Sequence, residues 1–368
     1  MIYILELEPL KERYTYWWKD YIPKQITKNK KCHVISGEAL TDKVETGTVL
    51  DAASTNYWKS SQLKQISQMF YEGKIKPGDD FLVCDIWFPG IEMLRYMEQL
   101  YNIPIKIWGV WHAGSSTMND FVEPMHHWSR FFEIGFLNIC NGIFVGSDYS
   151  KKSIIDRLLY MLPQSQTEEI ASRIFPYGMP LDYNYLTKYT TKNKKKQIIF
   201  PHRPDEEKNV HIWIALIGDL FARTDWFKDY NFVFSTSKEK YQSTSKWING
   251  LLYSSMKNFD NIVICENLSK EQYYKLLAES EVMISTTSEE NFGYCAVEAL
   301  AVGTKVLLPN SFSHPEIVEE NNMFLYNNYD EIEPKLTKLL STKIVNYELS
   351  KMVEPYEGVV RKWLEIMS

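Results

Sequence analysis

The chain has 368 residues, of which 45% are hydrophobic and 24% are charged, and its formal net charge is −6. This length favours two domains of roughly 150–200 residues each, and this composition is typical of a globular protein with sizeable cores. A negative net charge gives the whole chain no general attraction to nucleic acids or anionic membranes. No stretch reaches the roughly 18 consecutive apolar residues that a membrane-spanning helix needs.

The N-terminus and the cysteines predict a cytoplasmic protein. The sequence MIYILELEPL has no basic segment followed by a long apolar core, so we expect no signal peptide. Five cysteines are scattered along the chain without Cys-x-x-Cys spacing. This pattern favours free thiols in a reducing compartment over disulfides or a zinc site.

Apolar strands alternate with helix-length segments through the first half of the chain. The strands are predicted in IYILEL, KCHVISG, DDFLVCDIWF, IPIKIWGVWHAG, ICNGIFVGS and SRIFPYGMP, and a helix is predicted in DYSKKSIIDRLLYML. Such alternation predicts a parallel sheet covered by helices on both faces. In folds of this kind, ligands bind beyond the carboxyl ends of the strands.

A second series of strands and helices follows a polar stretch at residues 183–196, which we interpret as a hinge. The predicted strands are KQIIFPHR, NFVFSTS, NIVICEN, EVMISTT and TKVLLP; the predicted helices are NVHIWIALIGDLFART, LSKEQYYKLLAES, residues 294–301 and YEGVVRKWLEIMS. Ser269 and Gln272 have the spacing of a helix capping box. We therefore expect an α/β protein with two Rossmann-like domains, residues 1–182 and 183–354, facing each other across a cleft. Residues 355–368 are expected to return to the first domain.

The segment FPHRPDEEKNV places two cations directly after a predicted strand. Arg203 offers a fork of donors and Lys208 a mobile point charge, and both suit a diphosphate. A helix that begins near Asn209 would add the positive end of its dipole. The alternative is that the two cations only pair with the neighbouring acids at 205–207.

The segment EENFGYCAVEALAVGTKVLLP contains two glutamates, Glu290 and Glu298, with seven residues between them. A turn separates Glu290 from a predicted helix, and amides at a helix start can bind phosphate or sugar oxygens. A carboxylate accepts hydrogen bonds from both hydroxyls of a vicinal diol. Glu298 lies in an apolar run, where burial requires a partner. The alternative is a pair of surface charges without function.

With these residues in place, about residues 197–318 resemble the nucleotide-sugar domain of retaining GT-B glycosyltransferases, particularly glycosyltransferase family 4. The resemblance rests on RPDEEK, LSKEQYYKLLAESEVMISTTSEENFG, the Glu-x7-Glu spacing and AVGTKVLLPNSFSHPEIV. It implies that Arg203 and Lys208 bind the donor diphosphate and Glu298 the ribose. It further implies that the transferred sugar and its nucleotide meet Glu290, Asn291, Phe292, Gly293 and Tyr294.

The first half of the chain resembles the same family more loosely. IWGVWHAGSS is similar to a family strand that ends in an active-site histidine, here His112, with Gly114 beside it. IFVGSDYSKKSI and RIFPYGMPLD are similar to two further family passages. The family's Gly-Gly loop after the first strand is absent, and LEPLKERYTYWWKD stands in its place. Candidate residues on the acceptor side are Arg13, Tyr14, Trp17, Asp85 and Asp120. His126, His127 and His314 are assigned structural roles.

The absence of several sequence motifs disfavours some classes of enzyme. The sequence has no Asp-x-Asp motif, which favours a mechanism without a metal ion, with Arg203 and Lys208 neutralising the leaving diphosphate. We expect no cofactor besides the donor substrate. Walker A, Gly-x-Gly-x-x-Gly, Gly-x-Ser-x-Gly and His-Glu-x-x-His motifs are also absent, so a kinase, dehydrogenase or hydrolase has little support.

The function that these features favour is retaining transfer of a hexose, glucose by default, from a UDP-sugar to a hydroxyl acceptor. Two other classes stay open: a sugar-nucleotide epimerase or hydrolase, and a non-catalytic nucleotide-sugar sensor. For the acceptor, residues 11–31 combine seven basic and five aromatic residues with two acids. Such a segment suits the phosphate backbone and a stacked base, as in a phage-type enzyme acting on hydroxymethylated pyrimidine in DNA. It equally suits peripheral membrane contact, with a lipid-linked sugar or envelope polysaccharide as acceptor.

Overall fold

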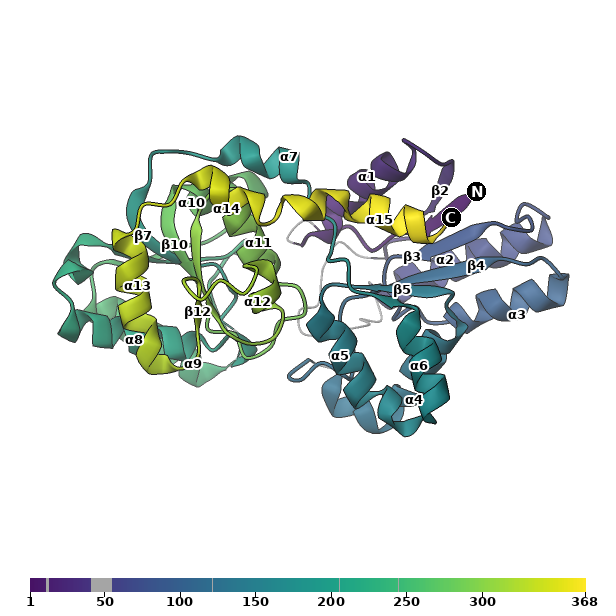
Figure 1. Ribbon diagram of the computed structural model, residues 1–368, viewed down its shortest axis with the longest axis horizontal. Helices are drawn as coiled ribbons and strands as arrows, with labels where there is room; N and C mark the ends of the chain where they lie inside the picture. Colours follow the sequence, from purple (N-terminus) through teal and green to yellow (C-terminus); the bar gives the residue numbers. More distant parts are fainter. Residues whose placement is uncertain (11–12, 41–54, 121, 205, 244) are drawn as a thin grey trace. The chain divides into compact units, whose positions relative to one another are not determined.

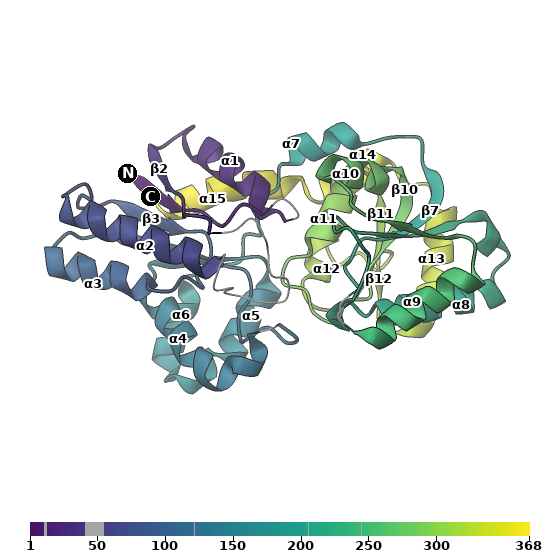
Figure 2. The same ribbon diagram turned by 180° about the vertical axis from the view of Figure 1, so that it is seen from behind.

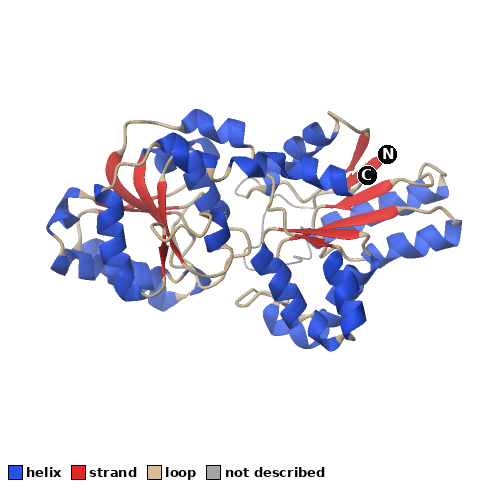
Figure 3. Cartoon of the chain, viewed as in Figure 1, coloured by secondary structure: helices blue, strands red, loops and turns tan. Residues whose placement is uncertain are grey.

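The structure is a computed structural model that describes residues 1–10, 13–40, 55–120, 122–204, 206–243 and 245–368 (Figure 1). The chain divides into two compact units. The first unit contains residues 1–180 and 358–368, and the second contains residues 181–357. Each unit is built on one six-stranded sheet, with helices packed on the strands (Figure 3).

The first unit is a parallel sheet in the order β2-β1-β3-β4-β5-β6. Its strands are β1 (Ile2–Leu5), β2 (Cys32–Ile35), β3 (Asp80–Val83), β4 (Lys106–Trp111), β5 (Gly142–Val145) and β6 (Ile174–Phe175). Its helices are α1 (Thr15–Ile26), α2 (Thr55–Tyr71), α3 (Ile91–Tyr101), α4 (His126–Ile139), α5 (Asp148–Arg157), α6 (Gln164–Ser172) and α15 (Val359–Ile366). The order of the strands reverses between β1 and β3, which makes that position the switch point of the sheet.

The two ends of the chain lie close together in the first unit, as Figures 1 and 2 show. The last helix, α15, packs against α1. Its fully buried Trp363 stacks on Phe144 of β5, with ring centroids 5.0 Å apart, and meets the edge of Trp18 of α1 at 6.3 Å. Because aromatic side chains of this size bury large apolar areas, these contacts fix the C-terminal helix on the first sheet.

The second unit is a parallel sheet in the order β12-β11-β10-β7-β8-β9. Its strands are β7 (Lys195–Phe200), β8 (Asn231–Ser235), β9 (Ile262–Cys265), β10 (Ser280–Ile284), β11 (Lys305–Pro309) and β12 (Leu325–Tyr326). Its helices are α7 (Tyr183–Leu186), α8 (Val210–Arg223), α9 (Lys246–Asn258), α10 (Lys270–Glu279), α11 (Tyr294–Ala301), α12 (His314–Ile317), α13 (Ile332–Ser341) and α14 (Asn346–Lys351). This is the strand order of a Rossmann sheet, and its switch point lies between β7 and β10.

The structure confirms the predicted α/β fold with two Rossmann-like parallel sheets. Helix α11 begins and ends at the predicted residues, and Ser269 and Gln272 form the predicted capping box at the start of α10. Some features differ from the sequence analysis, which did not predict helices α9, α13 and α14. The stretch interpreted as a hinge contains α7, and the short strand β12 was not predicted. The five cysteines are unpaired, and no helix in the described ranges is long and apolar enough to span a membrane.

Candidate functional site

The switch point of the second sheet brings two loops together, because β7 and β10 are hydrogen-bonded neighbours. The hydroxyl of Thr286 donates to the backbone carbonyls of Lys208 and Asn209, at 3.1 Å each. The amide of Ser288 donates to the carbonyl of Glu207 at 2.9 Å, and the Asn209 side chain donates to the carbonyl of Thr286 at 3.1 Å. The loop after β7 is therefore fixed to the loop after β10.

This pairing of loops places Lys208 against Glu290. The ammonium of Lys208 lies 3.3 Å from Oε2 of Glu290, and the amide of Gly293 donates to Oε1 at 3.2 Å. Gly293 has φ = +84°, and a Cβ at this position would come within 2.7 Å of Ile317, so glycine is required here. Burial raises the pKa of Glu290, but the Lys208 ammonium outweighs burial and holds that pKa below its ordinary value. Glu290 is thus an ionised carboxylate beside a cation.

Arg203 lies on the same loop and is paired with a neighbouring acid. Its guanidinium donates to the carboxylate of Glu207 at 2.6 Å, and the side chain as a whole is 37% exposed. The alternative of the sequence analysis, a pair with a neighbouring acid, is therefore realised for Arg203; Asp205 lies outside the described residues. Exposed ion pairs contribute about 0–1 kcal/mol. An incoming anion can consequently compete with Glu207 for Arg203.

Glu298 is buried and has the partners that its burial requires. The hydroxyl of Tyr274 donates to Oε1 of Glu298 at 3.2 Å, and the ammonium of Lys270 lies 3.8 Å from the same oxygen. Burial raises the pKa of Tyr274, and the charge of Glu298 raises it further, so Tyr274 stays protonated and keeps donating. The surface-charge interpretation does not describe Glu298, which is only 4% exposed.

The residues between the two glutamates have different surroundings. Phe292 is buried, and its ring meets the edges of Tyr294 at 4.8 Å and of Tyr356 at 5.0 Å. Asn291 and Tyr294 are half-buried at the start of α11. The structure therefore brings Lys208, Glu290 and the turn before α11 together, while Phe292 packs as an anchor of that turn.

Two histidines lie beside Glu290: the sequence analysis does not name His202, and it assigns His314 a structural role. His202 is the second residue after the end of β7, and His314 is the first residue of α12, which follows β11. Burial is the main cause that lowers the pKa of His202 to about 3 and that of His314 to about 4. A single histidine forms no sequence motif that would mark it as a site residue. The signal in the sequence is a position beyond the end of a predicted strand, which among the histidines supports a site role in the sequence analysis only for His112.

The first sheet has its own group of polar side chains near its switch point. His112 follows β4, and its Nε2 lies 2.7 Å from the carbonyl of Cys84, while its Nδ1 lies 2.9 Å from the hydroxyl of Tyr14. Because a carbonyl oxygen only accepts, Nε2 carries the hydrogen and Nδ1 accepts from Tyr14. Burial lowers the pKa of His112, partly offset by Asp85, so the ring is neutral.

Asp85 lies beside His112 and forms an ion pair with the buried Lys59. The ammonium of Lys59, on α2, donates to Asp85 at 2.6 Å and to the carbonyl of Trp87 at 2.5 Å. Burial raises the pKa of Asp85, but the Lys59 ammonium outweighs burial and lowers that pKa. The sequence analysis did not include Lys59, because a lysine inside a predicted helix gives no sign that it is buried.

The other candidates of the first unit have different surroundings. A Cβ on Gly114 would lie 2.5 Å from Oε1 of the buried Glu133, so Gly114 serves close packing. Asp120 accepts a hydrogen bond from the amide two residues later. Trp17 meets the edge of a neighbouring tyrosine ring at 5.2 Å, and Arg13 is exposed. Residues 11 and 12 of the basic segment lie outside the described residues.

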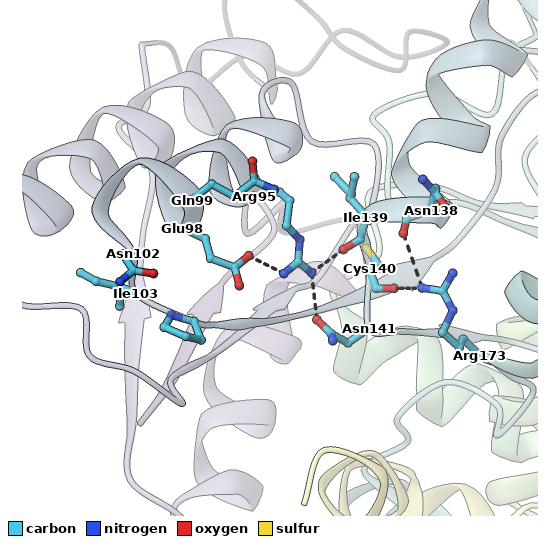
Figure 4. A pocket seen from close by; sticks show the side chains of 11 residues that line it. Arg95, Glu98, Gln99, Asn102, Ile103, Asn138, Ile139, Cys140, Asn141 and Arg173 are labelled. Carbon is cyan, nitrogen blue, oxygen red and sulfur yellow. Dashed lines mark hydrogen bonds and ion pairs between the residues drawn. The ribbon is translucent and has the colours of Figure 1, made fainter.

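A separate pocket of about 470 Å³ lies in the first unit (Figure 4). Its polar side chains already bind one another and the backbone. Arg95 pairs with Glu98 and donates to the carbonyl of Ile139 at 2.6 Å, and Arg173 donates to the carbonyl of Cys140. The lining residues precede β4, β5 and β6, so the pocket lies at the amino edge of the sheet. Ligands in such sheets bind at the opposite edge.

No three His, Cys, Asp or Glu side chains in the described ranges are grouped in a way that could hold a metal ion. Metal independence stays a prediction.

The second unit matches a known family. The sequence profile of the family "Glycosyl transferases group 1" matches residues 184–356. A curated relative, the tRNA-queuosine alpha-mannosyltransferase of Drosophila melanogaster, is 30% identical over 139 residues. That match covers 38% of this chain and 34% of the fly protein, so the chain spans about a third of the length of this relative.

Two solved structures show the fold similarity. A glycosyltransferase from Rickettsia africae ESF-5 superposes with a TM-score of 0.68 at 13% identity, covering 100% of this chain and 97% of that one. The pneumococcal O-GlcNAc transferase GtfA, solved with UDP and GlcNAc, gives a TM-score of 0.57 at 13% identity, covering 84% of this chain and 60% of that one. Residues 184–356 are therefore similar to the glycosyltransferase group 1 family, and the chain has the GT-B fold of two Rossmann-like domains.

Proposed function

We propose that the protein is a retaining glycosyltransferase that moves a hexosyl group from a nucleoside-diphosphate sugar to a hydroxyl group of a modified nucleoside in a nucleic acid, without a metal ion. The observation that carries this proposal is the ion pair between Lys208 and Glu290 at the switch point of the second sheet. It lies in the region that is similar to the glycosyltransferase group 1 family, one helix segment away from the buried Glu298.

The donor assignments follow from charge and hydrogen-bonding capacity. Arg203 and Lys208 bind the diphosphate and stabilise the negative charge that grows on it as the bond to the sugar breaks. Glu290 and the amides before α11 bind the transferred sugar, and Glu298 binds the ribose hydroxyls. GtfA was solved with UDP, which supports a uridine donor. The fly relative is named a mannosyltransferase, so mannose joins glucose as a candidate sugar.

The acceptor assignment rests on α1 and on the fly relative, which is named for queuosine in tRNA. Lys24 is exposed on α1 and Lys28 is exposed just after it, and the ammonium of Lys19 lies 4.6 Å from the ring of Tyr16. Tyr16, 41% exposed, is the one large apolar or aromatic residue of α1 at the surface. A helix that inserts into a bilayer presents a broad apolar face instead. Exposed cations together with one aromatic ring that can stack on a base favour a nucleic acid over a lipid surface as the binding partner of α1.

A transfer assay tests the proposed function. Protein incubated with UDP-glucose or GDP-mannose and either bulk tRNA or hydroxymethylated DNA should yield a nucleoside with the mass of one added hexose, and the yield should be unchanged in EDTA. Loss of transfer on chelation with recovery in Mn²⁺ would contradict the metal-independent mechanism. Release of free sugar without an acceptor would favour a hydrolase. Nucleotide binding without any turnover would favour a non-catalytic sensor.

The cations of the loop after β7 should be needed for turnover and not for folding. Arg203→Ala and Lys208→Ala should each lower kcat on the order of 10²-fold, because each removes a group that stabilises the leaving diphosphate. The matched control is Lys275→Ala, an exposed lysine of α10, which should leave the rate unchanged. Steady-state kinetics with the best donor check this. Near-normal rates in both loop variants would remove the diphosphate assignment.

The two glutamates should separate nucleotide binding from sugar transfer. Glu298→Gln should weaken the binding of UDP or GDP by roughly 5- to 150-fold, the effect of removing one partner of a buried polar contact. Glu290→Ala should leave that affinity within a few-fold and lower kcat, because the product nucleotide lacks the sugar. Calorimetry and initial rates measure the two effects. Unchanged binding and turnover in both variants would mean that the spacing of the glutamates has no functional meaning.

A further inference from the structure

Three buried polar atoms near Glu290 have no hydrogen-bond partner among the described residues. They are Nε2 of His202, Oγ of Ser313 and Nδ1 of His314. The exposed fractions of these residues are only 5%, 1% and 1%. Most buried polar atoms in folded proteins are paired, because burial without a partner is costly. Three such atoms in one place indicate that a ligand supplies the missing partners.

These atoms belong to one edge of the second sheet. His202 lies beyond β7, and Ser313 and His314 lie beyond β11; both strands are neighbours of β10, which leads to Glu290. The amide of Ser313 donates to the backbone carbonyl of Glu290 at 3.3 Å. The three orphan atoms therefore come from loops that flank the carboxylate.

The two imidazoles also lie close to the charged pair. A Cβ built on Gly293, whose amide holds the Glu290 carboxylate, would be 3.8 Å from Cδ2 of His314. His202 lies close enough to Lys208, Glu290 and His314 for each to act on its pKa. The carbonyl of Ser311 lies near the His314 ring, yet Nδ1 makes no hydrogen bond of ordinary geometry with it.

The charge state of the imidazoles indicates which part of a donor they suit. Burial keeps both rings neutral at neutral pH. A phosphate oxygen only accepts hydrogen bonds and is best met by cations, which Arg203 and Lys208 provide. A hydroxyl both donates and accepts, so it pairs with a neutral imidazole nitrogen in either tautomer, and with the hydroxyl of Ser313.

We propose that His202, Ser313 and His314 hydrogen-bond the hydroxyl groups of the transferred hexose and determine which hexose the protein accepts. This inference rests on the proposed function and deepens it. A site built to hydrogen-bond a hydroxyl rejects an analogue without it strongly, because the site's own buried polar atoms are then left unpaired. The carboxylate of Glu290 can hydrogen-bond only a few of the hydroxyl groups of a hexose. His202, Ser313 and His314 bind the other hydroxyl groups by which hexoses differ.

Matched amide substitutions test the proposal atom by atom. The amide nitrogen of glutamine overlays Nε2 of histidine, and that of asparagine overlays Nδ1. His202→Gln and His314→Asn should therefore keep kcat/KM within about tenfold of wild type, whereas His202→Asn and His314→Gln should lose roughly 5- to 150-fold. Ser313→Ala, which removes a hydroxyl that has no hydrogen-bond partner among the described residues, should lose a similar factor with an unchanged melting temperature.

Donors that lack one hydroxyl give the decisive comparison. Wild type should use each monodeoxy donor less well than the parent, and each mismatched variant should lose that discrimination for one hydroxyl. Affinity for UDP or GDP should stay within about threefold in all five variants, since the nucleotide carries no hexose. Equal losses in matched and mismatched variants, or unchanged discrimination, would overturn the proposal. So would UDP or GDP affinity that falls as far as kcat/KM. A wild-type protein that binds neither nucleotide would instead refute the proposed function, and this inference with it.

Discussion

The parallel pairing of β7 with β10 is the constraint on which the rest of the site depends. It brings the loop after β7 beside the loop after β10, and the hydroxyl of Thr286 then fixes one to the other. In the sequence, 81 residues lie between Lys208 and Glu290. The two side chains are in contact because of this arrangement of the strands. Neutralising Glu290 with a cation makes an ionised carboxylate tolerable in a largely buried place.

The two sheets resemble each other in how they keep a carboxylate ionised at the switch point. Glu290 is held by Lys208 in the second unit, and Asp85 by the buried Lys59 in the first. In both places burial raises the carboxyl pKa and a lysine outweighs it. Removing the buried Lys59 would leave the charge of Asp85 poorly solvated, so this pair also contributes to the stability of the first unit.

The sequence predicted the local structure better than the contacts between distant segments. The bounds of α11, the capping box at Ser269 and the need for a partner at Glu298 all followed from short-range pattern and chemistry. The order of the strands did not, because nothing local says that β7 lies between β8 and β10. The surroundings of His202 and His314 were not predicted for the same reason: they are made by loops that lie far apart in the sequence, and a single histidine shows nothing of them.

A crystal structure of the protein with bound UDP or GDP is the most direct measurement of the donor site. We expect diphosphate oxygens within hydrogen-bonding distance, about 3 Å, of Arg203 and Lys208, and ribose hydroxyls at the same distance from Glu298. The pair between Arg203 and Glu207 should be broken in that complex. A nucleotide bound elsewhere, for example in the pocket of Arg95 and Arg173 in the first unit, would contradict the assignment of the switch point of the second sheet as the donor site.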